Sequence, residues 1–182
     1  MLRILDILFS LMGLVLGFPI LLVIYLVGLF DTGSPLFFQQ RVGRNKKPFT
    51  LIKFRTMSVN TPSVASHFVS ASAITPLGGF LRKTKLDELP QLWNVLKGEM
   101  SLVGPRPGLD NQLELTNARD KHGVYSVRPG ITGKGQVNDI DMSTPERLAK
   151  VDAEMINGLS LKSYFVYIIQ TVTGSGQGDR VG

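Results

Sequence analysis

The sequence predicts an α+β fold in which a long apolar N-terminal helix meets the membrane and a small mixed α/β domain follows it. Three observations support this prediction. The N-terminus is one uncharged apolar run, two short β-prone runs with a turn between them come next, and helix-forming stretches then alternate with Pro- and Gly-rich segments. We therefore expect residues 1–31 to be embedded in the membrane and residues 32–182 to form one domain at its surface, without internal repeats.

The composition limits the kinds of site that the chain can hold. Its 182 residues suffice for one domain with a hydrophobic core. Hydrophobic residues make up 43% and charged residues 19%, and the mean hydropathy is +0.14, an apolar excess that comes from the N-terminus. There is no cysteine, and only His67 and His122 could supply imidazole. Disulfides and thiolate metal sites are therefore excluded, and a His-rich zinc site is not expected.

The N-terminal apolar segment is long enough to cross a bilayer. Ile7–Phe30 contains 24 residues without a charge, between Asp6 and Asp31, and as a helix it would extend about 36 Å. Pro19, near its middle, removes a helical hydrogen bond and predicts a kink. Two topologies follow. One is a straight span with the basic domain inside, and the other is a kinked hairpin that enters and leaves by the same face.

The domain is expected to contain one β-hairpin and three loops. Pro35–Gln40 and Phe49–Phe54 are the β-prone runs, and the residues between them favour a turn. Asn60–Ser72 is rich in Ser, Thr and Ala and is expected to be a mobile loop. Gly104–Gly108 and Arg128–Gly135 are so rich in Pro and Gly that we expect loops there as well.

Three helices are expected in the rest of the domain. Leu89–Leu96 has a helical pattern that ends at Gly98. A second helix starts with Thr144 as its N-cap and Pro145 at its first position. Leu161–Val172 is apolar and is expected to pack on the core or on the membrane surface.

The basic residues are unevenly distributed. The net charge is +6, yet Thr32–Leu86 contains no Asp or Glu. Nine of the twenty Lys and Arg residues lie in this segment, directly after the apolar one: Arg41, Arg44, Lys46, Lys47, Lys53, Arg55, Arg82, Lys83 and Lys85. Such a distribution is typical of a face that rests on anionic lipid headgroups and of a site for a polyanionic substrate. We expect both.

Asp87 and Glu88 are the first acids after this basic segment. Two adjacent carboxylates repel each other and need a cation, a metal or solvent nearby. Pro90 is tolerated in the first turn of a helix, so we expect the pair at a helix start, where free N–H groups bind phosphate and carboxylates suit Mg²⁺. In the non-catalytic interpretation, Asp87 is only an N-cap and Glu88 only a solvated acid.

Four motifs in this order resemble the bacterial sugar transferase family, the monotopic phosphoglycosyl transferases. They are Lys53-Phe54-Arg55-Thr56-Met57, Leu86-Asp87-Glu88-Leu89-Pro90-Gln91, Gly104-Pro105-Arg106-Pro107 and Arg128-Pro129-Gly130-Ile131-Thr132-Gly133. The resemblance extends from the apolar N-terminus to about Val172, and it is specific because four separate motifs match.

The resemblance implies a phosphoglycosyl transferase that works by covalent catalysis in the first membrane step of bacterial glycoconjugate or polysaccharide synthesis. Asp87 would be the nucleophile that attacks the sugar-linked phosphate of a UDP-sugar and releases UMP. Undecaprenyl phosphate, a polyprenyl phosphate, would then take the phospho-sugar. Glu88 would hold Mg²⁺, which neutralises the pyrophosphate.

Five basic residues are candidates for binding the substrate phosphates. Arg106, between two prolines, has little backbone freedom and would present a forked donor. Arg82 and Arg128 are further candidates for the same task. Lys53 and Arg55 could line the site or hold the lipid phosphate, and the residues leave both possibilities open.

The resemblance also implies a re-entrant membrane helix, broken near a Ser-Pro pair, with both ends at the cytoplasmic face of the bacterial inner membrane. Pro19 matches this pattern, but Phe18 stands where Ser is expected. Relatives often carry an Asp shortly after the segment that matches Gly158-Leu159-Ser160, and no acid follows it here. The role of that Asp therefore cannot be carried over.

Two other functions are consistent with the sequence. The lipid phosphate could attack the UDP-sugar directly, with Asp87 as a base or metal ligand. Alternatively, a non-catalytic, membrane-anchored protein could bind anionic lipids or a partner through residues such as Arg44 and Lys47. Nucleic-acid binding is not expected, because the basic segment has few aromatics for base stacking. The short chain, without the extra membrane helices of larger relatives, favours a UDP-linked N-acetylated amino sugar as donor.

Overall fold

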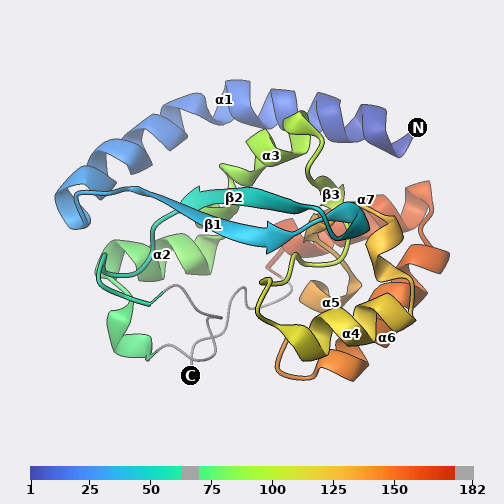
Figure 1. Ribbon diagram of the computed structural model, residues 1–182. Coiled ribbons are helices and arrows are strands. Elements are labelled where there is room, and N and C mark those ends of the chain that lie inside the picture. The colour runs from blue at the N-terminus through green and yellow to red at the C-terminus, as the bar shows by residue number, and fades with distance from the viewer. Residues whose placement is uncertain (63–69, 175–182) are drawn as a thin grey trace.

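Helix α1 (Leu2–Asp31) lies along one side of the domain in the computed structural model, which describes residues 1–62 and 70–174 (Figure 1). The helix continues through Pro19, and Figure 1 shows it as a gentle curve around the domain. Among the described residues it is the one helix long and apolar enough to cross a membrane. Only four of its residues are buried, namely Asp6, Ser10, Ile24 and Gly28. The predicted loop at Asn60–Ser72 lies mostly outside the described residues.

Polar contacts hold the N-terminal end of α1 on the domain. The buried carboxylate of Asp6 accepts hydrogen bonds from Ser101 Oγ (2.8 Å), Leu102 N (3.0 Å) and the Tyr164 hydroxyl (2.9 Å). Arg3 donates to main-chain carbonyls near the end of helix α3 (Gln91–Lys97), including Val95 O at 2.6 Å. A buried charge needs such partners, so these contacts fix the position of α1.

Apolar contacts hold the C-terminal end of the same helix. Ile24 packs with Phe54 and Leu81 in a buried cluster. Gly28 lies so close to Pro35 that a Cβ atom at position 28 would be 2.7 Å from the Pro35 Cβ. Both ends of α1 therefore contact the same domain.

The predicted β-hairpin is confirmed. Strands β1 (Leu36–Val42) and β2 (Pro48–Phe54) are antiparallel, and their register pairs the first residue of each strand with the last residue of the other. The turn contains two residues with positive φ, Asn45 at 56° and Lys46 at 59°. Asn tolerates this conformation better than most residues because its short side chain bonds locally.

A second, two-stranded sheet was not predicted. Strands β3 (Ser101–Val103) and β4 (Gly130–Thr132) are parallel, so the expectation of an uninterrupted loop at Arg128–Gly135 is wrong. A Cβ atom on Gly130 would lie 2.0 Å from Gly104 N. The glycines therefore allow the two main chains to touch, and the Pro- and Gly-rich composition reflects this close approach rather than a loop.

Helices surround the two sheets: α2 (Pro76–Thr84), α3, α4 (Leu113–Lys121), α5 (Lys134–Val137), α6 (Pro145–Asn157) and α7 (Leu161–Val172). All three predicted helices are confirmed. Helix α3 ends at Gly98, whose φ of 87° is left-handed, as a C-terminal glycine predicts. Helix α6 begins at Pro145, but the Thr144 hydroxyl donates to Asp141 O (3.4 Å) instead of capping the helix.

Helix α7 packs on the core and leaves an apolar face exposed. The Tyr164 side chain is fully buried, whereas Phe165, Val166, Ile169 and Val172 are exposed. Phe165 contacts Phe9 of α1 edge to face, with 6.0 Å between ring centroids. The exposed apolar faces of α1 and α7 therefore meet.

Candidate functional site

The acidic pair lies on a short 3-10 turn between two helices. This turn, η4 (Leu86–Glu88), follows α2 and precedes α3. Lys85 starts it with φ 59° and ψ 15°, a left-handed conformation that is uncommon for a residue other than glycine. Asp87 is buried, with 7% of its surface exposed. The sequence correctly indicated a helical start, although the helix begins three residues after Glu88.

Arg106 and Glu88 form an ion pair. The Arg106 Nη2 donates to Glu88 Oε1 at 2.6 Å, and both side chains are largely shielded, with 21% and 13% of their surfaces exposed. The pair joins the acidic turn to the Gly104–Pro107 loop across 18 residues of sequence. It therefore brings together two of the motifs on which the family resemblance rests.

Hydrogen bonds fix the main chain on both sides of Arg106. Four successive carbonyl oxygens each accept a bond from outside the loop: Pro105 O from Gly130 N (2.9 Å), Arg106 O from Arg119 Nη1 (2.7 Å), Pro107 O from Arg41 Nη1 (2.9 Å) and Gly108 O from Val42 N (2.9 Å). The donors come from β1, α4 and β4. The loop is thus rigid, and Arg106 is presented by a backbone with little freedom.

One of these donors belongs to a buried ion pair. Arg119 and Asp152 are 2% and 0% exposed, and Arg119 donates to Asp152 Oδ2 from Nε (3.0 Å) and Nη2 (2.7 Å). Burial raises the pKa of Asp152, and the charge of Arg119 opposes this shift. The pair joins α4 to α6 and directs the remaining guanidinium nitrogen at the carbonyl of Arg106.

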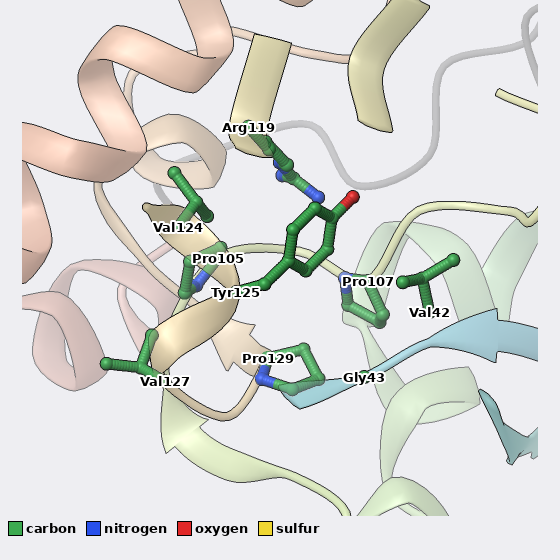
Figure 2. Close-up of a pocket in the computed structure, with 9 residues that line it drawn as sticks. All are labelled: Val42, Gly43, Pro105, Pro107, Arg119, Val124, Tyr125, Val127 and Pro129. Atoms are coloured by element: carbon green, nitrogen blue, oxygen red, sulfur yellow. The ribbon is translucent and has the colours of Figure 1, made fainter. Parts of the chain in front are cut away.

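The back of the loop is closely packed. Figure 2 shows the Tyr125 ring among Pro105, Pro107 and Pro129, with Arg119 at its edge. The hollow that these residues line encloses about 10 Å³, room for about one water molecule. This side of the loop therefore has no room for a substrate.

Arg106 itself lines a different, polar hollow between β2 and the loop. Six residues line it: Arg41, Leu51, Lys53, Gln91, Arg106 and Pro107. It too encloses about 10 Å³, enough for a single phosphate oxygen but not for a nucleotide sugar. Lys53 is 9% exposed and lies over the Phe37 ring, with 5.7 Å from Nζ to the ring centroid. The structure therefore brings Lys53 and Arg106 together beside Glu88.

Arg55 and Arg82 both contact residues at the ends of the hairpin, near the C-terminal end of β2. Arg55 Nε donates to Ser34 O (2.8 Å), and its guanidinium lies 5.3 Å from the Phe37 centroid. Arg82 Nη1 lies 3.4 Å from Thr56 Oγ1.

Arg128 lies away from the acidic pair. Its Nε donates to Gly98 O (2.7 Å), at the C-terminal end of α3, whereas Asp87 and Glu88 precede the N-terminal end. Of the five predicted phosphate ligands, Arg106 contacts Glu88 directly and Lys53 shares the polar hollow with Arg106.

Lys85 was missed as a candidate, although its position next to Leu86 and Asp87 is visible in the sequence. Burial lowers the pKa of Lys85, and the nearby Glu88 and Asp139 carboxylates oppose this shift. Its Nζ also donates to Thr171 O (3.2 Å) in α7. Arg41 and Arg119 were missed as well, because their role depends on main-chain contacts that only the fold reveals.

The residues present are compatible with Mg²⁺. Within residues 1–62 and 70–174, no cluster of three or more acidic or imidazole side chains could hold a metal by itself. Mg²⁺, however, typically binds one or two carboxylates and completes its shell with water and substrate phosphates. Asp87 and Glu88 match that pattern, provided that Arg106 shares Glu88 with the ion.

A family model described as bacterial sugar transferase matches residues 1–177. The chain belongs to the bacterial sugar transferase family.

Individual relatives in this family support the match. The chain is 35% identical over 188 residues to the exopolysaccharide production protein ExoY of Sinorhizobium fredii, covering 92% of this chain and 81% of that protein. It is 38% identical over 162 residues to the undecaprenyl-phosphate galactose phosphotransferase of Salmonella typhimurium, covering 78% and 34%. It is 34% identical over 187 residues to the UDP-galactose-lipid carrier transferase of Erwinia amylovora, covering 93% and 39%. The chain thus spans little more than a third of these last two relatives.

Proposed function

We propose that this bacterial sugar transferase moves a sugar 1-phosphate from a UDP-sugar to undecaprenyl phosphate, through a covalent intermediate on Asp87. The observation that carries the proposal is the Glu88–Arg106 ion pair of 2.6 Å, which joins a buried Asp87 to a rigid cationic loop. A buried carboxylate beside cations suits attack on a phosphate anion, because the cations offset the repulsion between the two negative groups.

The reaction is a double displacement at one phosphorus. A carboxylate oxygen of Asp87 bonds to the sugar-bearing phosphorus of the UDP-sugar, and the bond from that phosphorus to the bridging oxygen breaks, so UMP leaves with the electron pair. An oxygen of undecaprenyl phosphate then attacks the same phosphorus and releases the Asp87 carboxylate. The product is a sugar diphosphate lipid, and the enzyme is restored.

Arg106 and Lys53 would stabilise the charge that builds on the equatorial phosphate oxygens. The hollow that they line admits one such oxygen, with the uridine and sugar outside it. Lys85, held beside Glu88, would be a third cation. Glu88, with Asp87, would hold Mg²⁺, which when bound neutralises the diphosphate and assists the departure of UMP.

Intact-protein mass spectrometry tests this proposal. Purified protein in detergent is mixed with Mg²⁺ and a panel of donors, including UDP-galactose and UDP-linked N-acetylated amino sugars, without lipid acceptor. We expect a mass gain of one sugar phosphate with the correct donor. The gain should be absent in Asp87→Asn and retained in Asp110→Asn, which changes an exposed carboxylate.

The same experiment separates the alternatives. Turnover with undecaprenyl phosphate but no adduct in its absence would support direct transfer in a ternary complex and contradict a covalent intermediate. Turnover that survives in Asp87→Asn would contradict the role of Asp87 altogether. The donor that produces the adduct names the sugar. Galactose is named in the two transferases from Salmonella typhimurium and Erwinia amylovora.

We also propose that both ends of α1 lie at the cytoplasmic face of the bacterial inner membrane, so that the helix enters the bilayer without crossing it. The contacts of Asp6 at one end and of Ile24 and Gly28 at the other support this topology, because all of them are made to one domain. The uncharged exposed face of α1 and the adjoining face of α7 would then contact lipid.

A further inference from the structure

An apolar groove lies between α1, the hairpin and the start of α3. It encloses about 320 Å³, which is within the range of small-molecule sites. Ten residues line it: Leu14, Phe18, Leu21, Leu22 and Tyr25 of α1, Leu36, Ile52 and Phe54 of the hairpin, and Pro90 and Trp93. The Tyr25 hydroxyl and the Trp93 indole N–H are the two side-chain polar groups among them. Such a lining accepts hydrocarbon and excludes a nucleotide or a sugar.

The two ends of the groove are closed by packing. At one end α1 approaches α3 so closely that a Cβ atom on Gly13 would lie 2.8 Å from Leu92 Cδ1. At the other end Ile24, Phe54 and Leu81 form their buried cluster. Between these contacts α1 stands away from the hairpin, and Trp93, which is 53% exposed, lies at the rim.

The groove adjoins the candidate active site. Leu86, next to Asp87 in the chain, packs against the same cluster as the groove residues Leu21 and Leu36. At the start of α3, Pro90 lines the groove and the adjacent Gln91 lines the polar hollow of Lys53 and Arg106. A ligand with an apolar chain and a phosphate at one end fits this succession of surfaces.

We infer that the groove binds the polyprenyl chain of the acceptor, in the isoprene units nearest its phosphate. The inference rests on the proposed function, which makes the acceptor a polyprenyl phosphate. A chain held between α1 and Trp93 would emerge at the acidic turn with its phosphate directed at the sugar-bearing phosphorus. The groove thus holds the hydrocarbon of the acceptor, whereas the uridine and sugar of the donor lie outside it.

The fluorescence of Trp93 reports occupancy of the groove directly, because Trp93 is the only tryptophan of the chain. The protein is placed in nanodiscs of phosphatidylglycerol and phosphatidylethanolamine, and undecaprenyl phosphate or farnesyl phosphate is added. We expect a saturable shift of the Trp93 emission to shorter wavelength. Undecaprenol, which lacks the phosphate, should need a higher concentration. An emission that undecaprenyl phosphate leaves unchanged would overturn the inference. An equal shift on addition of extra phosphatidylglycerol would also overturn it, because the groove would then be filled by the acyl chain of an ordinary bilayer lipid.

A matched pair of variants tests the groove in catalysis. Leu22 lines it and Leu26, one turn further along α1, does not, although their exposures of 45% and 47% are nearly equal. Leu22→Phe should partly fill the groove and raise the KM for undecaprenyl phosphate at least about tenfold. Leu26→Phe should leave this KM unchanged. Equal effects of the two substitutions would contradict the inference.

The first half-reaction separates this inference from the proposed function. The Asp87 adduct needs only the donor, so Leu22→Phe should form it at the rate of the unsubstituted protein. If the unsubstituted protein forms no adduct, the covalent mechanism fails, whatever Trp93 reports. If the adduct forms and turns over but Leu22→Phe keeps a normal KM for the acceptor, only the groove assignment fails.

Discussion

At the scale of single residues, the least expected feature is the conformation of Lys85. Its backbone is left-handed, at φ 59°, which costs a non-glycine residue about 1–2 kcal/mol. Burial lowers the pKa of its ammonium, and the nearby Glu88 carboxylate counteracts the shift. Strain of this kind persists at functional sites where the surroundings enforce it. We therefore interpret Lys85 as a cation positioned for the acidic turn.

Replacing Lys85 by glycine distinguishes the effect of its backbone strain on stability from the effect of its ammonium group on catalysis. Lys85→Gly relieves the backbone and removes the ammonium, so the free energy of unfolding should change by no more than about 1 kcal/mol. Turnover should fall at least about tenfold. Lys46 offers a matched control, because it is exposed and has the same φ of 59°. Lys46→Gly should leave turnover unchanged, and an equal loss in both variants would contradict the role of Lys85.

The Glu88–Arg106 pair predicts a linked change in turnover and metal dependence. Arg106→Gln removes a phosphate donor and should lower kcat by about 10²-fold. The same change frees Glu88 from its 2.6 Å partner, so Mg²⁺ should reach half-maximal activation at a lower concentration. Steady-state rates across a Mg²⁺ titration measure both quantities. Arg147→Gln, at an exposed position of α6, is the control, and a higher Mg²⁺ requirement in Arg106→Gln would count against shared use of Glu88.

The sequence located the acidic pair and Arg106 because each belongs to a short, distinctive motif. It could not rank the five basic candidates, since proximity to Asp87 depends on the fold. Arg128 shows the difficulty, because the structure places it at Gly98, beyond the far end of α3 from the acids. Arg119 carries no local signal at all, since its partner Asp152 is 33 residues away.

At the scale of secondary-structure elements, α4 and α6 hold the Arg106 loop through one buried ion pair. Arg119 and Asp152 are both almost inaccessible to solvent. Removing one member would leave an uncompensated charge in the interior, which is far costlier than losing an exposed pair. The two helices therefore depend on this contact for their relative position.

Arg119→Met should lower the free energy of unfolding by about 3–5 kcal/mol. The double variant Arg119→Met with Asp152→Leu should recover much of this loss, because it leaves no buried charge unpaired. Lys121 and Glu146 join the same two helices at 3.7 Å but are 71% and 64% exposed, so Lys121→Met should cost less than about 1 kcal/mol. Urea unfolding in detergent measures all three, and an equal cost for Arg119→Met and Lys121→Met would refute the argument.

The contact of α7 with α1 should weaken at high pH. Burial and the Asp6 carboxylate raise the pKa of Tyr164 far above its usual 10.0. Above pH 10 the unfolded chain loses this proton while the folded chain keeps it, so the unfolded state binds fewer protons and stability falls as pH rises. Below pH 10 the contribution is fully present. Tyr164→Phe should be less stable at pH 8 but lose less further stability between pH 9 and 11, as thermal unfolding would show.

The elements themselves were partly predictable. The hairpin and α7 carry simple periodic or apolar patterns, and their observed bounds agree closely with the expected ones. The pairing of β3 with β4 could not be predicted, because each strand has three residues and its signal is hidden by glycines that composition assigns to loops. Those glycines serve the contact between Gly104 and Gly130.

At the scale of the whole molecule, α1 and the domain form one body, on which the exposed apolar faces of α1 and α7 adjoin. A helix of 30 residues extends about 45 Å, enough to cross a bilayer. Contacts at both of its ends hold it to the domain, and residues 32–86 of the domain include nine basic residues and no acid. A straight span would have to take this charged domain into the hydrocarbon, at a high cost in desolvation.

Labelling of single introduced cysteines tests this placement. The chain has no cysteine of its own, so no native thiol would react with the reagent. Leu2→Cys reports the start of α1 and Ser58→Cys, at an exposed position, reports the domain. Both should be protected from an impermeant maleimide in intact cells and labelled after the inner membrane is permeabilised. Labelling of Leu2→Cys but not Ser58→Cys in intact cells would establish a full span instead.

The four bonded carbonyls around Arg106 also bear on how new donor specificities could arise. The loop is tied to β1, α4 and β4, so inserting or deleting a residue in any of these would move Arg106 along with it. The connection between α5 and α6, residues 138–144, supplies none of these ties. Its Asp139 carboxylate lies near Lys85 and opposes the lowering of the Lys85 pKa, so the connection borders the site. Exchanging it between family members should therefore change which sugar is accepted while the chemistry stays intact. Such chimaeras should retain more activity than those with a junction inside α4.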